Sequence, residues 1–189
     1  AMQTLKRQIL RVARTDANVL ICGETGTGKE LVAHAVHTAS PRCKRLFYPQ
    51  NCAAIPSSLL ESSFFGSEKG AYTGSVHSKG ILEQADGGTV FLDEINSLDP
   101  AVQRKILRAL ETKKLRRLGG TREIQSDFRI VSAMNEDPFA CMRSGKIRND
   151  LFFRLSTVIL EVPPLRQRRD DIPLLAEYFL KKFCPQGPG

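Results

Sequence analysis

The sequence predicts an α/β domain with a mostly parallel sheet, and three observations support this prediction. The chain has 189 residues, of which 41% are hydrophobic and 25% charged, so it can bury a core of ordinary size. Short apolar runs alternate with stretches of helical period, as in proteins whose parallel strands are connected by helices. A glycine-rich turn follows the first run and opens a helical stretch. No run approaches the roughly 18 apolar residues that a membrane-spanning helix needs, so no membrane partner is expected.

The strands and helices can be assigned from these runs in chain order. Five apolar runs are expected to form strands, at 18–22, 46–48, 89–92, 128–133 and 157–162. Three stretches are expected to form helices, at 29–39, 100–113 and 172–183. Asp99 is a suitable N-cap for the second helix, because its carboxylate can accept from free backbone amides, and Pro100 fits the first helical position. Pro163 and Pro164 stop the last strand.

Charge and cysteine usage narrow the choice of partner and compartment. The 28 basic and 20 acidic residues give a formal net charge of +8. This charge suits a nucleotide, a nucleic acid or an acidic protein surface, although a solvated basic surface has the same composition. The five cysteines are an odd number without a C-x-x-C pair, which indicates reduced thiols in a cytoplasm. His34 and His37 share a helix face but have no third ligand at a useful spacing, so they are not expected to bind a metal.

A phosphate-binding loop is predicted between the first strand and the first helix. The segment fits the pattern G-x-x-x-x-G-K and consists of Gly23, Glu24, Thr25, Gly26, Thr27, Gly28 and Lys29. Glycines let the backbone amides turn toward phosphates, the helix N-terminus adds a positive dipole end, and Lys29 can reach the outer phosphates. Glu30 stands where Ser or Thr would offer a hydroxyl to Mg²⁺, so the metal must depend on another group or on water.

Two carboxylates at the end of the third strand can supply that group. Asp93 and Glu94 directly follow the apolar run 89–92. Asp93 is expected to hold Mg²⁺ through the water shell of the ion, and Glu94 is expected to be the base that polarises the attacking water. Together with the upstream loop, this pair predicts an enzyme that binds and hydrolyses ATP with Mg²⁺.

The most specific motif of the chain lies at 66–75. This segment resembles the sigma-contacting loop of the AAA+ ATPase domain in the bacterial enhancer-binding proteins, the NtrC-like activators of sigma-54 RNA polymerase. The usual form of that loop is G-A-F-T-G-A, and its counterpart here is Gly70, Ala71, Tyr72, Thr73, Gly74 and Ser75. Tyr72 replaces Phe and Ser75 replaces Ala, so the strength of sigma contact is an open question.

The resemblance covers almost the whole chain and includes the phosphate loop, where Glu commonly follows Lys in this family. It implies a P-loop NTPase core of three αβα layers around a mostly parallel sheet, with the helical lid largely missing. It also implies two residues that sense the nucleotide, Asn51 beside the catalytic Glu and Asn135 beside the γ-phosphate. Arg148 and Arg154 match the arginine fingers that act on ATP held by a neighbouring subunit; without the resemblance they read as solvated helix residues.

The resemblance also implies a division of the chain into two parts. Residues 1–165 are expected to form the AAA+ core, and 166–189 the linker and first helix of a truncated lid. The basic run 113–120 is expected to form a second surface loop beside 70–75, with direct DNA readout as the alternative. The chain is expected to be a fragment of a longer bacterial cytoplasmic protein, to bind and hydrolyse ATP weakly when alone, and to be mostly monomeric.

The expected function is that of an ATP-hydrolysing transcriptional activator domain that remodels the closed complex of sigma-54 RNA polymerase. Its expected partners are the polymerase holoenzyme, other copies of the chain in a ring of six or seven, and promoter or enhancer DNA through domains absent here. Two alternatives stay open. One is a nucleotide-regulated binding module for sigma factor or DNA that does not hydrolyse ATP productively. The other is an AAA+ remodeller acting on nucleic acid, which would leave the motif at 70–75 unexplained.

Overall fold

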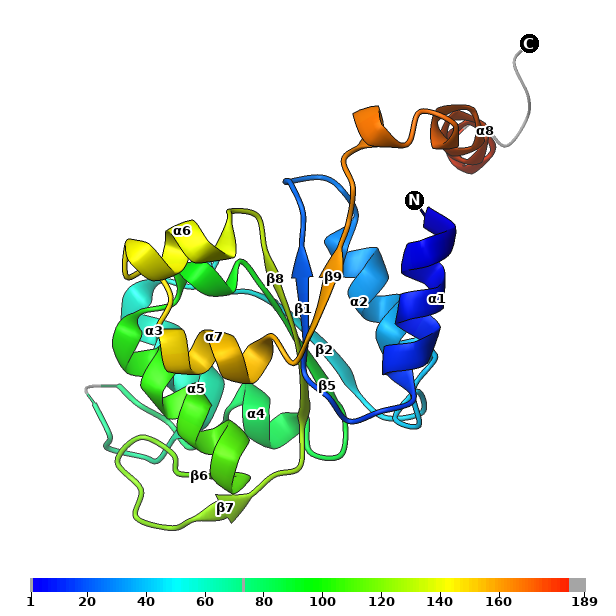
Figure 1. Cartoon of the computed structure of the whole chain (residues 1–189). Helices are drawn as coiled ribbons and strands as arrows, with labels where there is room; N and C mark the ends of the chain where they lie inside the picture. The colour runs from blue at the N-terminus through cyan, green and yellow to red at the C-terminus, as the bar shows by residue number, and fades with distance from the viewer. Residues whose placement is uncertain (1, 73, 184–189) are drawn as a thin grey trace.

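A five-stranded parallel sheet forms the centre of the molecule (Figure 1). The computed structural model describes residues 2–72 and 74–183. The strand order is β2-β5-β8-β1-β9, and every neighbouring pair is parallel. The strands are β1 (Val19–Cys22), β2 (Phe47–Asn51), β5 (Thr89–Asp93), β8 (Arg129–Met134) and β9 (Val158–Glu161). Because the strands run in one direction, all their carboxyl ends meet at one edge, where ligands bind in open α/β sheets.

Helices cover both faces of this sheet, which gives the three layers that the sequence predicts (Figure 1). One face carries α1 (Met2–Ala13) and α2 (Lys29–Thr38). The other carries α3 (Ser57–Phe65), α4 (Ile81–Gln84), α5 (Pro100–Thr112), α6 (Pro138–Arg143) and α7 (Asn149–Leu155). Across residues 2–72 and 74–183, no helix is both long and apolar enough to cross a membrane.

The alternation of side chains along the strands explains why both faces need cover. Val90 and Leu92 of β5 pack into the core on the α5 side, whereas Phe91 packs with α1 and α2. Leu20 of β1 likewise joins the first core, and its neighbours Val19 and Ile21 join the second. Successive side chains of a strand point to opposite faces, so continuous apolar runs produce a sheet that is buried on both sides.

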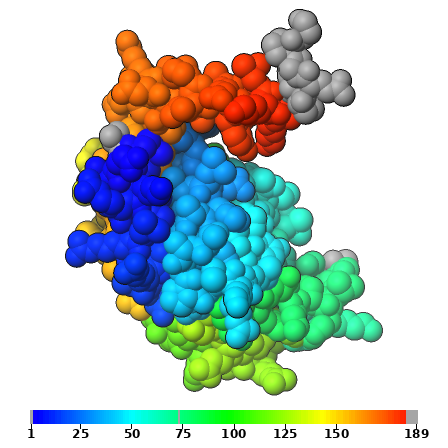
Figure 2. All heavy atoms as spheres, turned by 90° about the vertical axis from the view of Figure 1, so that its right-hand side faces the viewer, coloured from blue at the N-terminus to red at the C-terminus, as the bar shows by residue number. Residues whose placement is uncertain are grey.

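Three smaller features lie outside the central layers. The β3 (Gly66–Ser67) and β4 (Ser78–Lys79) strands pair antiparallel at the base of one loop, and β6 (Lys114–Leu115) pairs in the same way with β7 (Ile124–Gln125). Short 3₁₀ turns occur at η1 (Ile95–Ser97) and η2 (Leu165–Gln167). Helix α8 (Asp171–Phe183) follows η2 and buries none of its residues. In Figure 2 the linker and α8, orange to red, cross the top of the molecule above the blue N-terminal segments.

The structure differs from the sequence prediction mainly by additional elements. Strand β2 continues through Pro49 to Asn51, whereas the apolar run predicted an end at Tyr48. Proline is tolerated because β2 is an edge strand that pairs only with β5. Helices α1, α3, α4 and α6 and the short ladders β3–β4 and β6–β7 were not expected, whereas α7 agrees with the interpretation of Arg148 and Arg154 as helix residues. Most of these elements are short, and helix α1 is the main exception.

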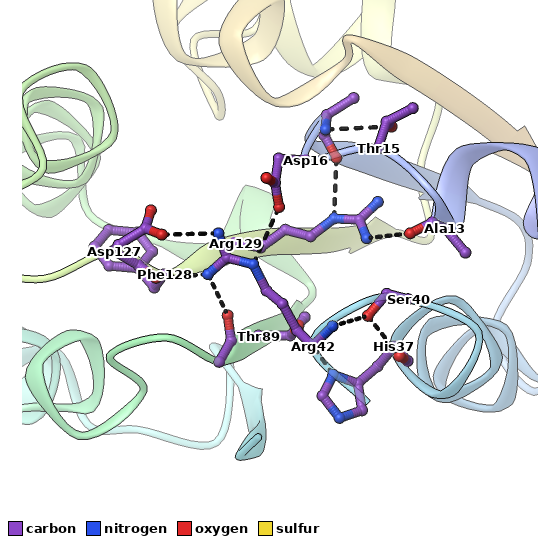
Figure 3. Close-up of polar contacts among 12 residues, drawn as sticks. Ala13, Thr15, Asp16, His37, Ser40, Arg42, Thr89, Asp127, Phe128 and Arg129 are labelled. Atoms are coloured by element: carbon purple, nitrogen blue, oxygen red, sulfur yellow. Dashed lines mark hydrogen bonds and ion pairs between the residues drawn. The ribbon is translucent and has the colours of Figure 1, made fainter. Parts of the chain in front are cut away.

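A buried arginine holds α1 against the sheet (Figure 3). Arg129, the first residue of β8, is only 2% exposed, and its guanidinium donates to the carbonyl oxygens of Val12 (3.0 Å), Ala13 (3.4 Å) and Ala17 (3.1 Å). These carbonyls lie at and just beyond the C-terminus of α1, where free carbonyls and the helix dipole favour a cation. Burial lowers the pKa of Arg129, and the negative charge of Asp16 opposes that shift.

Candidate functional site

The loop at 23–29 connects the carboxyl end of β1 to the N-terminus of α2. Gly28 is the N-cap of α2 and has φ 96°, a left-handed conformation that favours glycine. Gly23 lies so close to the chain after β9 that a Cβ there would come within 2.8 Å of the Val162 carbonyl oxygen. The sequence therefore folds this segment as a tight turn onto a helix N-terminus, the geometry that binds phosphate.

The side chain of Lys29 is turned back over this loop. It is 7% exposed, and its Nζ donates to the carbonyl oxygens of Gly23 (2.9 Å) and Glu24 (3.0 Å). The hydroxyl of Thr27 also donates to the Glu24 carbonyl oxygen (2.8 Å). These bonds fix a single positive charge at the mouth of the loop, where the outer phosphates of a nucleotide would lie.

The carboxylates of Asp93 and Glu94 follow β5 at the same edge of the sheet. Both side chains are half-buried. Glu94 has φ 52° and ψ 48°, which is unusual for a residue with a side chain, and its amide donates to Asp93 Oδ1 (3.0 Å). Residues held in such strained conformations cluster at functional sites, because the surrounding structure must impose them.

Asn135 joins this carboxylate to the phosphate loop. It follows β8, which lies between β5 and β1 in the sheet. Its Nδ2 is 3.5 Å from both Thr25 Oγ1 and Glu94 Oε1, at the long end of the hydrogen-bond range. Its Oδ1 is buried and accepts no hydrogen bond from the described residues. A single amide side chain therefore spans the two motifs that the sequence separates by about seventy positions.

The structure does not bring Asn51 into contact with Glu94. Asn51 ends β2 opposite Asp93, and its Oδ1 accepts from the backbone amides of Ala53 (2.8 Å) and Ala54 (3.2 Å). Within the part of the chain that the structure describes, the side-chain hydrogen bond to Glu94 comes from Asn135. The role of Asn51 as a switch on Glu94 stays a prediction.

Of the two predicted finger arginines, Arg148 is the N-cap residue of α7 and Arg154 lies in its last turn. The guanidinium of Arg148 forms two hydrogen bonds with Asp150 (3.1 and 2.7 Å). The guanidinium of Arg154 is exposed and approaches the Leu110 carbonyl oxygen at 3.5 Å. Neither contacts Lys29 or Glu94 of its own chain among the described contacts, so any action on a bound phosphate would require a second copy.

The described residues of the motif, 70–72 and 74–75, belong to the connection between β3 and β4. Tyr72 is 45% exposed, as expected for a contact residue, while Ser75 is buried. The Ser75 hydroxyl accepts from the Tyr72 amide (3.1 Å) and donates to the Glu68 carbonyl oxygen (3.3 Å), so serine at this position ties the loop to its own base. Thr73, the remaining predicted contact residue with a polar side chain, lies outside the described residues.

The basic run 113–120 lies beside this loop, as the sequence predicts. The amide of Leu118 donates to the Gly66 carbonyl oxygen (3.0 Å), and the amide of Glu68 donates to the Leu118 carbonyl oxygen (3.0 Å). Arg117, which sequence reasoning did not single out, forms ion pairs with Glu68 (2.9 Å) and Glu83 (2.7 Å). These bonds connect the basic run 113–120 to the base of the loop at 70–75.

A cavity of about 820 Å³ opens next to the phosphate loop, between α1 and the end of β9. Its size suits a nucleoside. It is lined by Thr4, Leu5, Gln8, Cys22, Gly23, Glu24, Ile159, Glu161, Val162, Pro163, Pro164 and Gln167. Residues from α1 and from the end of β9 and the segment after it line this cavity, so its walls come from both ends of the domain. Burial and the nearby Glu161 raise the pKa of the Cys22 thiol to about 11.

Comparison with known proteins agrees with this geometry. The family described as "Sigma-54 interaction domain" matches residues 1–161. The transcriptional activator RocR of Bacillus subtilis is 50% identical over 182 residues, which are 96% of this chain and 40% of RocR. The response regulator protein PilR of Pseudomonas aeruginosa is 50% identical over 184 residues, which are 97% of this chain and 41% of PilR. The chain thus spans about two fifths of the length of these relatives.

Solved structures give the same result. NtrX from Brucella abortus, crystallised in complex with ATP, is 39% identical and superposes with a TM-score of 0.90 over 98% of this chain and 42% of NtrX. A P-loop NTPase domain of a sigma-54 activator from E. coli, 17% identical, superposes with a TM-score of 0.60 over 87% of this chain and 95% of its own, which supports the fold alone. The chain has a P-loop NTPase fold and belongs to the sigma-54 interaction domain family.

Proposed function

We propose that this domain hydrolyses ATP between subunits of a ring and uses the energy to remodel the closed complex of sigma-54 RNA polymerase. The observation that carries the proposal is the position of Asn135, whose amide reaches both Thr25 of the phosphate loop and Glu94. A phosphate bound by the loop would lie within reach of a carboxylate base and a polar sensor. That combination is needed for hydrolysis and is not required for binding alone.

Each residue of the site then has a task. The amides of 23–29 and the ammonium of Lys29 bind the phosphates, and Glu94 orients and deprotonates a water for attack on the terminal phosphorus. Asp93 fits a Mg²⁺ site, because its carboxylate has only the Glu94 amide as a hydrogen-bond partner among the described residues. When bound, Mg²⁺ neutralises charge on the outer phosphates.

Arg148 and Arg154 complete the site of a neighbouring subunit in this proposal. Their position on α7, outside the reach of the phosphate loop of their own chain, supports an action in trans. An arginine placed against the transferred phosphoryl group is typically worth about 10³ to 10⁵ in rate. Assembly of subunits thereby becomes a condition for turnover.

The loop at 70–75 is the part that contacts the sigma factor. Its exposed Tyr72 offers a large ring with a hydroxyl, and such residues favour interfaces where one end is apolar and the other wet. The hydrogen bonds between Leu118, Gly66 and Glu68 support the second loop as a brace for the first. Movement of subunits during hydrolysis would then shift both loops together.

The test measures ATP binding, ATP hydrolysis and opening of a sigma-54 promoter by polymerase in parallel. Glu94→Gln is expected to keep ATP binding and to lose hydrolysis and promoter opening, because the amide cannot take a proton from water. Tyr72→Ala is expected to keep binding and hydrolysis and to lose opening. Glu111→Gln removes an exposed carboxylate of α5 and is the matched control.

Three outcomes would contradict the proposal. Unchanged hydrolysis in Glu94→Gln would remove Glu94 from the role of base. Promoter opening by a protein that binds ATP without turnover would favour a nucleotide-regulated binding module. Normal opening by Tyr72→Ala would exclude its ring as the sigma contact.

A further inference from the structure

Two arginines of the linker before α8 bind directly to the phosphate loop. The guanidinium of Arg166 forms paired hydrogen bonds with the carboxylate of Glu24, one of them at 2.7 Å from Nη1 to Oε2. Planar pairing of this kind is directional as well as electrostatic. The guanidinium of Arg168 donates from Nη2 to the carbonyl oxygen of Thr27 (2.8 Å). The linker therefore contacts the loop through both a side chain and the backbone.

Arg168 also contacts the two helices at the ends of the domain. Its Nη1 lies 3.7 Å from the sulfur of Met2 in α1 and 3.9 Å from Asp171 Oδ2 at the start of α8. Its side chain is 14% exposed, and its buried Nε has no hydrogen-bond partner among the described residues. Helix α8 buries no residue of its own, so these linker contacts determine where it begins relative to the loop.

The charge on Glu24 makes the Arg166 contact sensitive to what the loop binds. Glu24 belongs to the loop that gathers amide groups and Lys29 around anionic phosphates, and its own carboxylate would repel them. The Arg166 hydrogen bonds lower the pKa of Glu24, and the guanidinium offsets the negative charge that this carboxylate places at the loop. No other ion pair of Glu24 occurs among the described residues.

We propose that Arg166 is a positioning residue that couples occupancy of the phosphate loop to the placement of α8. In the proposal Arg166 has two effects. It neutralises the charge of Glu24, so that this carboxylate does not repel a bound phosphate. It also transmits any displacement of the loop to the linker, while Arg168 holds the neighbouring part of the linker in place. The inference rests on the proposed function in one respect, namely that the loop binds ATP.

The test uses a fluorescent reporter on α8. The sequence contains no tryptophan, so Tyr178→Trp, at an exposed position of α8, introduces a single tryptophan whose emission reports on that helix alone. ATP is titrated into this protein and into its Arg166→Gln, Glu24→Gln/Arg166→Gln and Arg169→Gln derivatives. Equilibrium dialysis with labelled ATP measures binding independently of the fluorescence. Arg169 is an exposed linker arginine without an ion pair in the described part of the chain, so it is the matched control.

We expect ATP to change the tryptophan emission of the reporter protein and of Arg169→Gln equally. Arg166→Gln should lose this change and bind ATP about two- to fivefold more weakly, the size expected of an exposed ion pair. The double variant should recover the affinity, because the repelling carboxylate is gone, and should still lack the emission change. The two effects of Arg166 would thereby be separated.

Each contrary result has a definite meaning. An unchanged emission response in Arg166→Gln, with ATP bound, would overturn this inference and leave the proposed function intact. Weak binding that persists in the double variant would show that Arg166 contacts the phosphates directly, which also overturns it. A reporter protein that binds no ATP in dialysis would overturn the proposed function and the inference together.

Discussion

At the scale of single residues, the cysteines differ sharply in their surroundings. Cys22 ends β1 directly before the phosphate loop, and burial, with help from Glu161, raises the pKa of its thiol to about 11. Cys52 and Cys141 are buried, and burial raises the pKa of each thiol. Cys43 is exposed. Because the thiolate is the reactive form, the exposed Cys43 should react faster than the buried thiols whose pKa is raised.

We therefore expect iodoacetamide at pH 8 to alkylate Cys43 well before Cys22. With a pKa of about 11, only about one Cys22 thiol in a thousand is ionised at that pH, and the ionised fraction rises about tenfold with each further pH unit. Peptide mapping by mass spectrometry, which resolves every cysteine separately, measures the rates. Equal labelling of Cys22 and Cys43 in the folded protein at pH 8 would contradict the burial described here.

At the scale of elements, a buried arginine adds polar contacts to the apolar packing that attaches α1 to the sheet. Arg129 donates to carbonyl oxygens at and beyond the end of α1, and no carboxylate forms an ion pair with it among the described residues. The partial negative charge of these carbonyl oxygens thus balances the charge of the Arg129 guanidinium. Helix α1 in turn provides Thr4, Leu5 and Gln8 to the cavity beside the phosphate loop, so this attachment also shapes that cavity.

Arg129→Ala should lower the free energy of unfolding by about 3 kcal/mol, because it removes buried charge-assisted hydrogen bonds and leaves a cavity. Chemical denaturation followed by circular dichroism measures the change. Arg11→Ala, an exposed position in the last turn of α1, should change it by no more than about 0.5 kcal/mol. Similar effects of the two substitutions would mean that Arg129 does not hold α1.

At the scale of the whole molecule, the residues proposed for catalysis lie in two separate parts of the chain. Glu94 and the phosphate loop share one edge of the sheet, whereas Arg148 is the N-cap residue of α7 and pairs with Asp150. Under the proposed function, a complete site forms only where two copies meet, so two defects in different copies should be able to complement each other.

This leads to a mixing experiment. Glu94→Gln and Arg148→Ala proteins should each be nearly inactive in ATP hydrolysis, whereas an equimolar mixture should regain part of the activity. In the mixture, an intact Glu94 in one subunit can meet an intact Arg148 in the next. A coupled assay of phosphate release measures this. A mixture as inactive as its components would place both residues in the site of a single chain.

The phosphate loop and the pair Asp93–Glu94 could be predicted from sequence because their chemistry depends on neighbouring residues in a fixed order. The strands of the sheet were predictable for the same reason, since each is a local apolar run. The contact of Arg166 with Glu24 joins residues 142 positions apart, and that of Arg129 with Val12 joins residues 117 apart. No local pattern marks such pairs, because the fold alone makes them neighbours.

The left-handed backbone at Glu94 lowers the stability of the fold, whereas the proposed function requires a carboxylate at this position. A residue with a side chain costs roughly 1–2 kcal/mol in this conformation, a cost that glycine avoids. Selection for thermal resistance alone would therefore favour Glu94→Gly, whereas under the proposed function selection for turnover would reject it. Under the proposed function, the most stable sequence of this domain and its active sequence would therefore differ at position 94.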